Sequence, residues 1–196
     1  MSKISRKQAK RRQEIIEAAI PLITSASFEE ISVSDICRSI GISIGSFYHY
    51  FSKKSDLLIG LLWLIDEDLA ENTFPLLTSE NELENIRIFS HGWAEHIDRH
   101  GLERSKLISA INPDSSDFSE SSRESIKKLR ELFGKALAKG QVRIKYDADF
   151  LTDYFLLMMR SVSTDWSRRD GNYDIVKKMD EFTLFFLDGI KPVSTE

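Results

Sequence analysis

Residues 32–58 read SVSDICRSIGISIGSFYHYFSKKSDLL, and this stretch decides the fold. Ser32 followed three residues later by Asp35 is typical of a capping box at a helix N-terminus, and Gly41 suits the left-handed residue that ends a helix. Ser43 can cap a further helix of about two turns. Two short helices separated by two or three residues are therefore predicted, and this is the pattern of a helix-turn-helix.

The second of these helices carries more aromatic side chains than a buried segment needs. Tyr48, His49 and Tyr50 are consecutive, and three consecutive helical positions span about 200° of arc, so they cannot all face the core. Phe47 and Phe51 are the better core anchors. The remaining face is expected to present aromatic and hydroxyl groups to a partner.

Basic residues gather at the N-terminus. Residues 1–56 contain nine Lys and Arg against six Asp and Glu, a net charge of +3, whereas the rest of the chain carries −7. Six of the nine are Lys3, Arg6, Lys7, Lys10, Arg11 and Arg12, and no acidic residue precedes Glu14. Such an arm can condense on a polyanion, although a solvated terminus has the same composition.

The composition describes a globular protein that is 41% hydrophobic and 30% charged over 196 residues. The single cysteine, Cys37, excludes a disulfide framework and a cysteine-based zinc site; we interpret it as a packing residue, with redox sensing as the alternative. The N-terminus does not have the pattern of a secretory signal, and no apolar run reaches the ~18 residues needed to span a bilayer. A reducing cytoplasm is the expected location.

Helical periodicity extends through nearly the whole chain, which predicts an all-α protein of about nine helices. A first helix over 7–24 precedes the helix-turn-helix at 32–51, and a fourth, capped by Ser52, runs to about Asn72. Ser79 with Glu82 forms a capping box for the fifth, while the serine-rich stretch 112–122 is predicted to be a mobile loop. We predict a three-helix DNA-binding domain over 1–56 and a helical effector-binding and dimerisation domain over 57–196.

The run from Ser32 to Leu58 closely resembles the signature of TetR-family transcriptional regulators, and the match extends over about residues 7–60. The positions in register are Ser32, Asp35, Gly41, Gly45, the Tyr48–Phe51 aromatic run, Lys54 and Leu57. The resemblance implies an operator-binding homodimer with a C-terminal domain for a small-molecule effector. Ile44 stands where many relatives have a polar or basic residue, so a base contact there is apolar, such as one to a thymine methyl.

The second helix of a helix-turn-helix enters the major groove of double-stranded DNA. Small hydroxyls, tyrosine hydroxyls and lysines suit phosphates or base edges, and glycine permits close backbone approach. The predicted DNA-binding residues are Ser32, Ser34, Ser43, Ile44, Gly45, Ser46, Tyr48, His49, Tyr50, Lys53 and Lys54.

Two C-terminal helices, over about 147–166 and 173–187, are apolar around most of their circumference. A helix of this kind must bury more than one side. We predict a homodimer in which these helices form a four-helix interface, as the resemblance also implies. The alternative is a pair of helices central to a monomer core.

The resemblance also implies an effector pocket, for which aromatic and thioether groups supply adaptable apolar walls. The candidate lining residues are Trp63, Phe74, Phe89, Trp93, Met158 and Met159. His96 and His100 lie four residues apart on one helical face, a spacing that can hold a metal or an anionic ligand. His100 equally suits a helix C-terminus, and we assign neither a metal nor a cofactor.

The sequence thus predicts a sequence-specific transcriptional regulator, a repressor that binds a palindromic operator as a dimer and is released by a small molecule. A ligand-independent architectural or nucleoid-associated protein with the same N-terminus is the alternative. An enzyme is not expected, because the phosphate-loop and zinc-protease motifs GxxxxGK[ST] and HExxH do not occur.

Overall fold

The computed structural model describes residues 3–25, 28, 30–109, 123–143 and 145–192, and all regular structure in these ranges is helical. The chain divides into two compact units, Met1–Leu64 and Ile65–Glu196. The predicted all-α fold, with an N-terminal helix-turn-helix followed by a larger helical region, is confirmed. The predicted boundary after Asp56 lies at the start of the helix Asp56–Asp68, within which the division after Leu64 falls.

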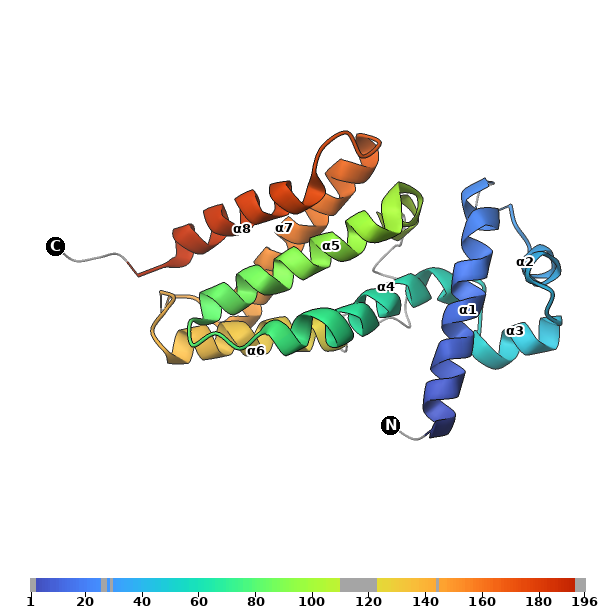
Figure 1. Ribbon diagram of the computed structural model, residues 1–196, viewed down its shortest axis with the longest axis horizontal. Helices are drawn as coiled ribbons and strands as arrows, with labels where there is room; N and C mark the ends of the chain where they lie inside the picture. Colours follow the sequence, from blue (N-terminus) through green and yellow to red (C-terminus); the bar gives the residue numbers. More distant parts are fainter. Residues whose placement is uncertain (1–2, 26–27, 29, 110–122, 144, 193–196) are drawn as a thin grey trace. The chain divides into compact units, whose positions relative to one another are not determined.

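The N-terminal unit consists of α1 (Lys3–Ser25), α2 (Val33–Ile40), α3 (Ile44–Tyr50) and most of α4 (Asp56–Asp68) (Figure 1). Its core contains fully buried side chains from all four helices, including Ala19, Ile36, Phe47 and Leu61. Gly60 lets α4 approach α1 closely, because a Cβ atom there would lie 2.4 Å from Cδ1 of Ile16.

The predicted caps of the helix-turn-helix are confirmed. The Ser32 hydroxyl accepts from the Asp35 N–H at 3.1 Å, and the Asp35 carboxylate accepts from the Ser32 N–H at 3.0 Å. Gly41 ends α2 with φ 69°, and the Ser43 hydroxyl caps α3. These bonds satisfy backbone donors that a helix end leaves unpaired, so they fix both ends of the turn between α2 and α3.

The predicted start of the fourth helix at Ser52 is wrong, since α4 begins at Asp56. The Asp56 carboxylate accepts from the N–H groups of Ser52 at 2.8 Å and Lys53 at 3.2 Å, and this closes a separate turn ahead of the helix. Beyond Asp68 the chain continues as a π-helix over Leu69–Thr73 and a 3-10 turn over Phe74–Leu76.

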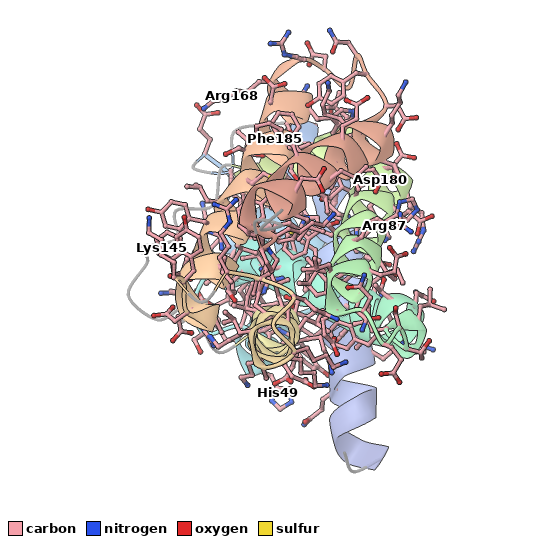
Figure 2. All side chains as sticks on the ribbon, turned by 90° about the vertical axis from the view of Figure 1, so that its left-hand side faces the viewer. His49, Arg87, Lys145, Arg168, Asp180 and Phe185 are labelled. Carbon is pink, nitrogen blue, oxygen red and sulfur yellow. The ribbon has the colours of Figure 1, made fainter. Side chains whose placement is uncertain are left out.

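The C-terminal unit is built around α5 (Glu82–Ser109), which packs against α6 (Glu124–Ala138), α7 (Ala148–Arg168) and α8 (Ile175–Ile190) (Figures 1 and 2). Phe89, Leu129, Phe133, Phe155 and Met159 are fully buried between these helices. The described residues contain eight α-helices rather than about nine. The predicted fifth helix lies in α5, which has two helical parts separated at Gly101 by a non-helical backbone (φ 81°, ψ 176°), and this kink is where a further short helix was expected to begin.

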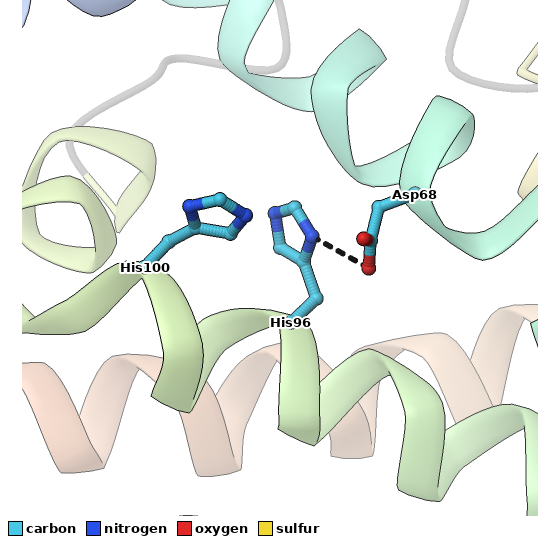
Figure 3. Close-up of side chains that lie close together, drawn as sticks. All are labelled: Asp68, His96 and His100. Atoms are coloured by element: carbon cyan, nitrogen blue, oxygen red, sulfur yellow. Dashed lines mark ion pairs between the residues drawn. The ribbon is translucent and has the colours of Figure 1, made fainter. Parts of the chain in front are cut away.

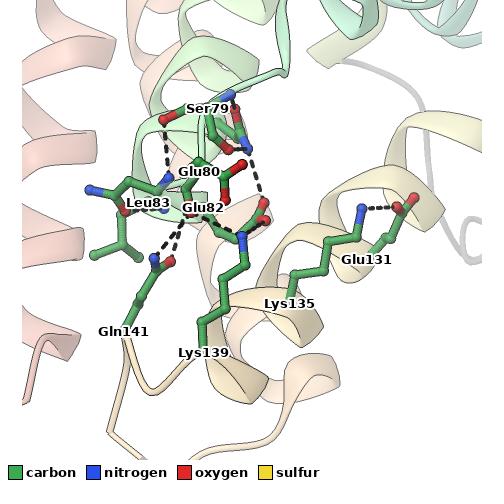
Figure 4. Close-up of polar contacts among 10 residues, drawn as sticks. Ser79, Glu80, Glu82, Leu83, Glu131, Lys135, Lys139 and Gln141 are labelled. Carbon is green, nitrogen blue, oxygen red and sulfur yellow. Dashed lines mark hydrogen bonds and ion pairs between the residues drawn. The ribbon is translucent and has the colours of Figure 1, made fainter.

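The predicted capping box of Ser79 and Glu82 does not form. Asn81 takes the capping position instead, because its side-chain oxygen accepts from the Leu83 N–H at 3.0 Å. The Glu82 N–H donates to the side chain of Gln141 at 2.9 Å, so the start of α5 is held by the segment after α6 (Figure 4). A partner 59 residues away thus replaces the local one that the sequence pattern favours.

Within the described ranges, none of the helices is both long and apolar enough to cross a membrane. The stretch 112–122, predicted to be a mobile loop, lies outside the described residues.

Candidate nucleic-acid interface

One face of α3 is anchored in the core of the N-terminal unit and the opposite face is open. Phe47 and Phe51 are buried with their ring centres 5.1 Å apart. Ile44 and Tyr48 remain 49% and 52% exposed, which is unusual for side chains with such large apolar surfaces. Ser46 and His49 are exposed beside them, and Tyr50 is half-buried with its ring edge against His49. The helix therefore presents a rigidly held, mixed apolar and polar surface.

Gly45 lies on this exposed face without a steric need within the chain. A Cβ atom added there would meet only the Ser43 hydroxyl oxygen, at 3.9 Å, which is an ordinary contact. Its backbone is helical, so no left-handed conformation requires glycine. The N-terminal unit by itself does not explain the missing side chain.

Several predicted hydroxyl groups already serve the backbone. The Ser32 hydroxyl lies 2.5 Å from the Asp35 carboxylate, and this hydrogen bond holds the pKa of Asp35 below its usual value. The Ser43 hydroxyl accepts from the Ser46 N–H at 3.0 Å and lies 2.9 Å from the Ser46 hydroxyl. Ser34 is exposed on α2. These groups remain at the surface while they fix the helix ends.

Lys54 fastens the connection between α1 and α2. Its ammonium group donates to the carbonyl oxygens of Phe28 at 2.6 Å and Ile31 at 2.9 Å, and it lies 4.6 Å from the centre of the Phe28 ring. Lys53, its neighbour in the same turn, is half-buried. Sequence reasoning identified Lys54 as a phosphate contact but did not identify this role, since its partners lie 23 and 26 residues away.

The basic arm is the beginning of α1, which starts at Lys3. Lys10 and Arg11 are exposed, and Arg11 pairs with Glu14 at 2.8 Å. Arg12 instead turns inward, with its guanidinium carbon 3.5 Å from the centre of the Trp63 ring. The side chains of Lys3, Arg6 and Lys7 are not among the described ones.

Residues 15–61, which span the buried face of α1, the helix-turn-helix and the start of α4, match the family described as bacterial regulatory proteins, tetR family. The N-terminal unit therefore has the DNA-binding region of TetR-family regulators. The chain is 26% identical to the transcriptional regulator AcuR of Cereibacter sphaeroides, over 73% of its own length and 70% of AcuR. It is 24% identical to the HTH-type transcriptional repressor KstR2 of Mycobacterium tuberculosis, over 97% and 98% of the two chains.

A solved structure extends the likeness across both units. The transcriptional regulator FadR of Bacillus subtilis, in complex with stearoyl-CoA, matches with a TM-score of 0.72. The match covers 91% of this chain and 98% of FadR, at 18% identity. At that identity the likeness establishes the fold alone, so the C-terminal unit has the fold of FadR.

The predicted effector-lining residues do not all come together. Phe74, Phe89 and Trp93 form a row in the C-terminal unit, with ring centres 6.3 Å and 6.5 Å apart. The indole nitrogen of Trp93 is buried and has no hydrogen-bond partner among the described residues. Met159 is fully buried in the same unit. Trp63 belongs to the N-terminal unit, where it stacks with Arg12.

Met158 lies apart from that row. It lines a cavity of about 660 Å³ beside α7 and the start of α8, together with Val162, Tyr173 and Phe182. Burial and the neighbouring Asp165 carboxylate raise the pKa of Tyr173 to about 12, so its hydroxyl stays protonated at neutral pH.

A buried ion pair in the C-terminal unit was not predicted from the sequence. The guanidinium of Arg123 donates to the Asp66 carboxylate at 2.7 Å and 3.2 Å, and the Ser125 hydroxyl donates to the same carboxylate. Arg123 and Asp66 are 4% and 8% exposed. The pair joins the end of α4 to the start of α6, and the Arg123 guanidinium lies 5.6 Å from the Trp93 ring centre. A separation of 57 residues leaves no local signal.

A second polar cluster combines Asp68 with the two histidines that the sequence singled out (Figure 3). One ligand atom from each of Asp68, His96 and His100 lies within 4.8 Å of the others. His96 is 1% exposed, and burial lowers its pKa to about 4, so its ring is neutral at pH 7. The Asp68 carboxylate accepts from Arg99 at 2.8 Å and Asn72 at 2.9 Å. Burial raises its pKa, but His96 and Arg99 outweigh burial, and the pKa lies below the usual value.

An apolar surface runs along α7 and α8. Its members, each large and at least 40% exposed, are Phe150, Tyr154 and Leu157 on α7 and Phe182 and Phe185 on α8. Phe185 is 81% exposed (Figure 2). Its neighbour Phe186 faces the interior instead, with its ring centre 5.1 Å from Phe155 and 6.4 Å from Phe133.

Proposed function

We propose that this TetR-family chain is a transcriptional repressor that binds a palindromic operator as a homodimer and leaves the operator when a small molecule binds its C-terminal unit. The observation that carries the proposal is the open face of α3, where Ile44 and Tyr48 are about half exposed on a helix anchored by Phe47 and Phe51. A helix of this width fits the major groove of B-DNA, which is about 12 Å wide.

Within this interface the exposed groups divide into two roles. Tyr48 and the hydroxyls of Ser32, Ser34 and Ser43 contact phosphates, as do Lys53 and Lys54, and these contacts orient the protein without reading sequence. Ile44, Ser46 and His49, with Tyr50 beside them, contact base edges, and Ile44 suits a thymine methyl. The glycine at position 45 supports close backbone approach to DNA, because a Cβ atom there would make only one ordinary contact within the chain, with the Ser43 hydroxyl oxygen at 3.9 Å.

The apolar surface of α7 and α8 supports the homodimer. On α7, Phe150, Tyr154 and Leu157 are spaced by four and three residues, so they lie on one helical face. Contiguous apolar patches of this kind on soluble proteins mark interaction sites. A two-fold dimer through this surface supplies two α3 helices, and its operator then has two half-sites related by the same symmetry.

For the effector, we propose binding beside the row of Phe74, Phe89 and Trp93. The buried indole N–H of Trp93 lacks a partner in the described part of the chain, and a ligand oxygen there would supply one. FadR holds stearoyl-CoA in a structure of the same fold. Release requires a ligand that prefers the conformation with low DNA affinity, and such coupling is typically about 1–3 kcal/mol.

The proposal is tested by selecting bound fragments from a random DNA pool with the purified full-length protein. Enrichment of an inverted repeat supports a dimeric, sequence-specific regulator. The variant Tyr48→Phe should then weaken all fragments alike, whereas Ile44→Ser should change which sequence is enriched. A pool that is retained without enrichment of any sequence favours the architectural alternative, in which DNA binding is independent of sequence and ligand. As a regulator of bacterial operators, the protein would act in the cytoplasm.

A further inference from the structure

We infer that the C-terminal unit holds a divalent transition-metal ion, with Zn²⁺ as the simplest case, between Asp68, His96 and His100. The three side chains come from two elements: Asp68 from the last residue of α4 and both histidines from α5 (Figure 3). This site is independent of whether the proposed operator binding is correct.

The donor set fits a transition metal better than a hard cation. Two imidazoles and one carboxylate suit Zn²⁺ and its neighbours, whereas Ca²⁺ and Mg²⁺ need several oxygen ligands. The three donor atoms lie within 4.8 Å of one another. Bonds of about 2.0–2.2 Å to a tetrahedral ion separate ligands by roughly 3.4 Å, so a modest side-chain rotation of His100 completes the set.

The spacing of His96 and Asp68 also fits two ligands of one ion. Nδ1 of His96 lies 3.0 Å from Oδ2 of Asp68, close to the separation of two ligands on a tetrahedral ion. An ion between them would replace their direct contact. The ring is 1% exposed, so solvent does not satisfy it.

Neighbouring groups hold the carboxylate in place. Arg99 and Asn72 both donate to Oδ1 of Asp68, which leaves Oδ2 directed toward His96. Such outer partners orient metal ligands. The positive charges of Arg99 and of the buried Arg104, which also acts on His96, oppose a cation. The surroundings of the site therefore favour an ion that forms strong bonds to imidazole nitrogen, because binding cannot depend on an excess of negatively charged side chains around it.

Both ends of the cluster coincide with irregular helix geometry. Asp68 immediately precedes the π-helix Leu69–Thr73, and His100 immediately precedes Gly101, where α5 leaves helical geometry. π-helical turns inside helices occur frequently at functional sites. Three ligands, of which Asp68 and His100 are half-buried, leave a coordination position for water or for an anionic group of a small molecule.

The test uses the untagged full-length protein, first stripped of metal with a chelator. Equilibrium dialysis against Zn²⁺ should give one ion per chain, and Co²⁺ should give the visible absorption of a four-coordinate site with nitrogen and oxygen ligands. His100→Ala and Asp68→Asn should each weaken Zn²⁺ binding by at least about tenfold. His91→Ala is the matched control, because His91 lies on the same helix beside Asp180 at 3.1 Å but outside the cluster.

His100 and Asp68 are only partly buried, so these variants are expected to fold, and circular dichroism with a thermal melt verifies that they do. The inference is overturned if the wild-type chain binds no Zn²⁺ and gives no Co²⁺ spectrum. It is equally overturned if folded His100→Ala and Asp68→Asn proteins keep wild-type affinity, or if His91→Ala is the variant that loses the ion.

Discussion

The ammonium nitrogen of Lys54 lies 2.6 Å from the carbonyl oxygen of Phe28 and 4.6 Å from the centre of the Phe28 ring. A residue proposed to contact phosphate is therefore also a structural tie within the N-terminal unit. The same cation holds the connection that leads into α2 and, under the proposed function, would neutralise DNA charge. Any substitution at Lys54 changes both properties, and the two must be measured separately.

Replacing Lys54 by methionine should lower the unfolding free energy by about 1–3 kcal/mol, because the side-chain stem remains while two charge-assisted hydrogen bonds to carbonyl oxygens are lost. Urea denaturation of the variant and the wild type measures this difference. Lys10→Met is the control, since Lys10 is exposed on α1 and its loss should leave stability within about 0.5 kcal/mol. Equal stability of Lys54→Met and the wild type would show that the tie to Phe28 contributes nothing.

The DNA affinity of the same variant gives the second measurement. If Lys54 contacts a phosphate, the slope of log affinity against log salt should fall by about 0.9 under conditions in which the variant is fully folded. If the Lys54→Met protein is folded and its salt slope is unchanged, Lys54 does not contact a phosphate and has only its structural role.

Local signals in the sequence were sufficient for the helix-turn-helix. The caps at Ser32, Asp35 and Ser43 depend on partners three residues away, and the turn at Gly41 depends on its own backbone. Interactions of this kind are encoded within a single turn, so the pattern alone predicts them. The exposure of Ile44 and Tyr48 then follows from helical periodicity once Phe47 is taken as the anchor.

Long-range pairs could not be predicted in this way. The sequence predicts that Trp63 lines an effector pocket and that Arg12 belongs to a basic arm. In the structure the two side chains stack on each other, although they are far apart in the sequence. The ion pair of Asp66 with Arg123 is equally distant. Asp68 was missed although His96 and His100 were noticed, because their spacing is visible within one helix and the third partner lies on another.

In helix α8 the sequence does not show which apolar side chains are buried. Apolar residues occupy positions 182 and 184–187, so the pattern does not define which side is buried. The structure separates them: Phe186 packs on Phe133 and Phe155, while Phe185 is exposed. A charge at Phe186, which is half-buried, would therefore disturb the packing of the unit itself and would not test the dimer interface alone.

The proposed homodimer is tested by Phe185→Asp. Because Phe185 is 81% exposed, the charge should leave the fold and helix content of one chain unchanged, while it disrupts an interface built on α7 and α8. Sedimentation should show a monomer that has lost most of its operator affinity. Phe186→Asp is the contrasting variant, and it should lower stability by at least about 3 kcal/mol because it places a charge against two buried rings. A dimeric Phe185→Asp protein would place the interface elsewhere.

The ion pair of Glu82 with Lys139, 2.8 Å long and at the start of α5, predicts a pH dependence (Figure 4). Burial raises the pKa of Glu82, but hydrogen bonds from Lys139 and Asn85 outweigh it, and the folded pKa lies below the ordinary value of 4.5. The stabilisation is therefore present above about pH 4.5 and is lost as the pH falls through the folded pKa.

Glu82→Gln should lower the unfolding free energy at pH 7 by roughly 1–3 kcal/mol. The unfolding free energy of the variant should also fall less than that of the wild type as the pH is lowered below 4.5. Denaturant unfolding at several pH values measures both effects. Glu124→Gln is the control, because Glu124 forms an exposed pair with Lys127, and such pairs contribute about 1 kcal/mol or less. If the unfolding free energy of Glu82→Gln falls with decreasing pH in the same way as that of the wild type, the Glu82 carboxylate does not cause the loss of stability in acid.

The exposed glycine of α3 allows DNA binding to be separated from stability. Gly45→Ala adds one methyl group that meets only the Ser43 hydroxyl, at 3.9 Å, so the free protein should be unchanged or more stable by about 0.5–1 kcal/mol. If the backbone at Gly45 approaches DNA closely, the same methyl group should reduce operator affinity by at least about tenfold, or 1.4 kcal/mol.

Gly134→Ala in α6 is the matched control, since a Cβ there meets nothing within 4 Å, and it should gain similar stability without losing affinity. Fluorescence anisotropy with the selected operator, beside urea denaturation of the three proteins, measures both quantities. Wild-type affinity in a stable Gly45→Ala protein would mean that this face of α3 does not contact the DNA backbone closely, and the docking of the helix would have to be revised.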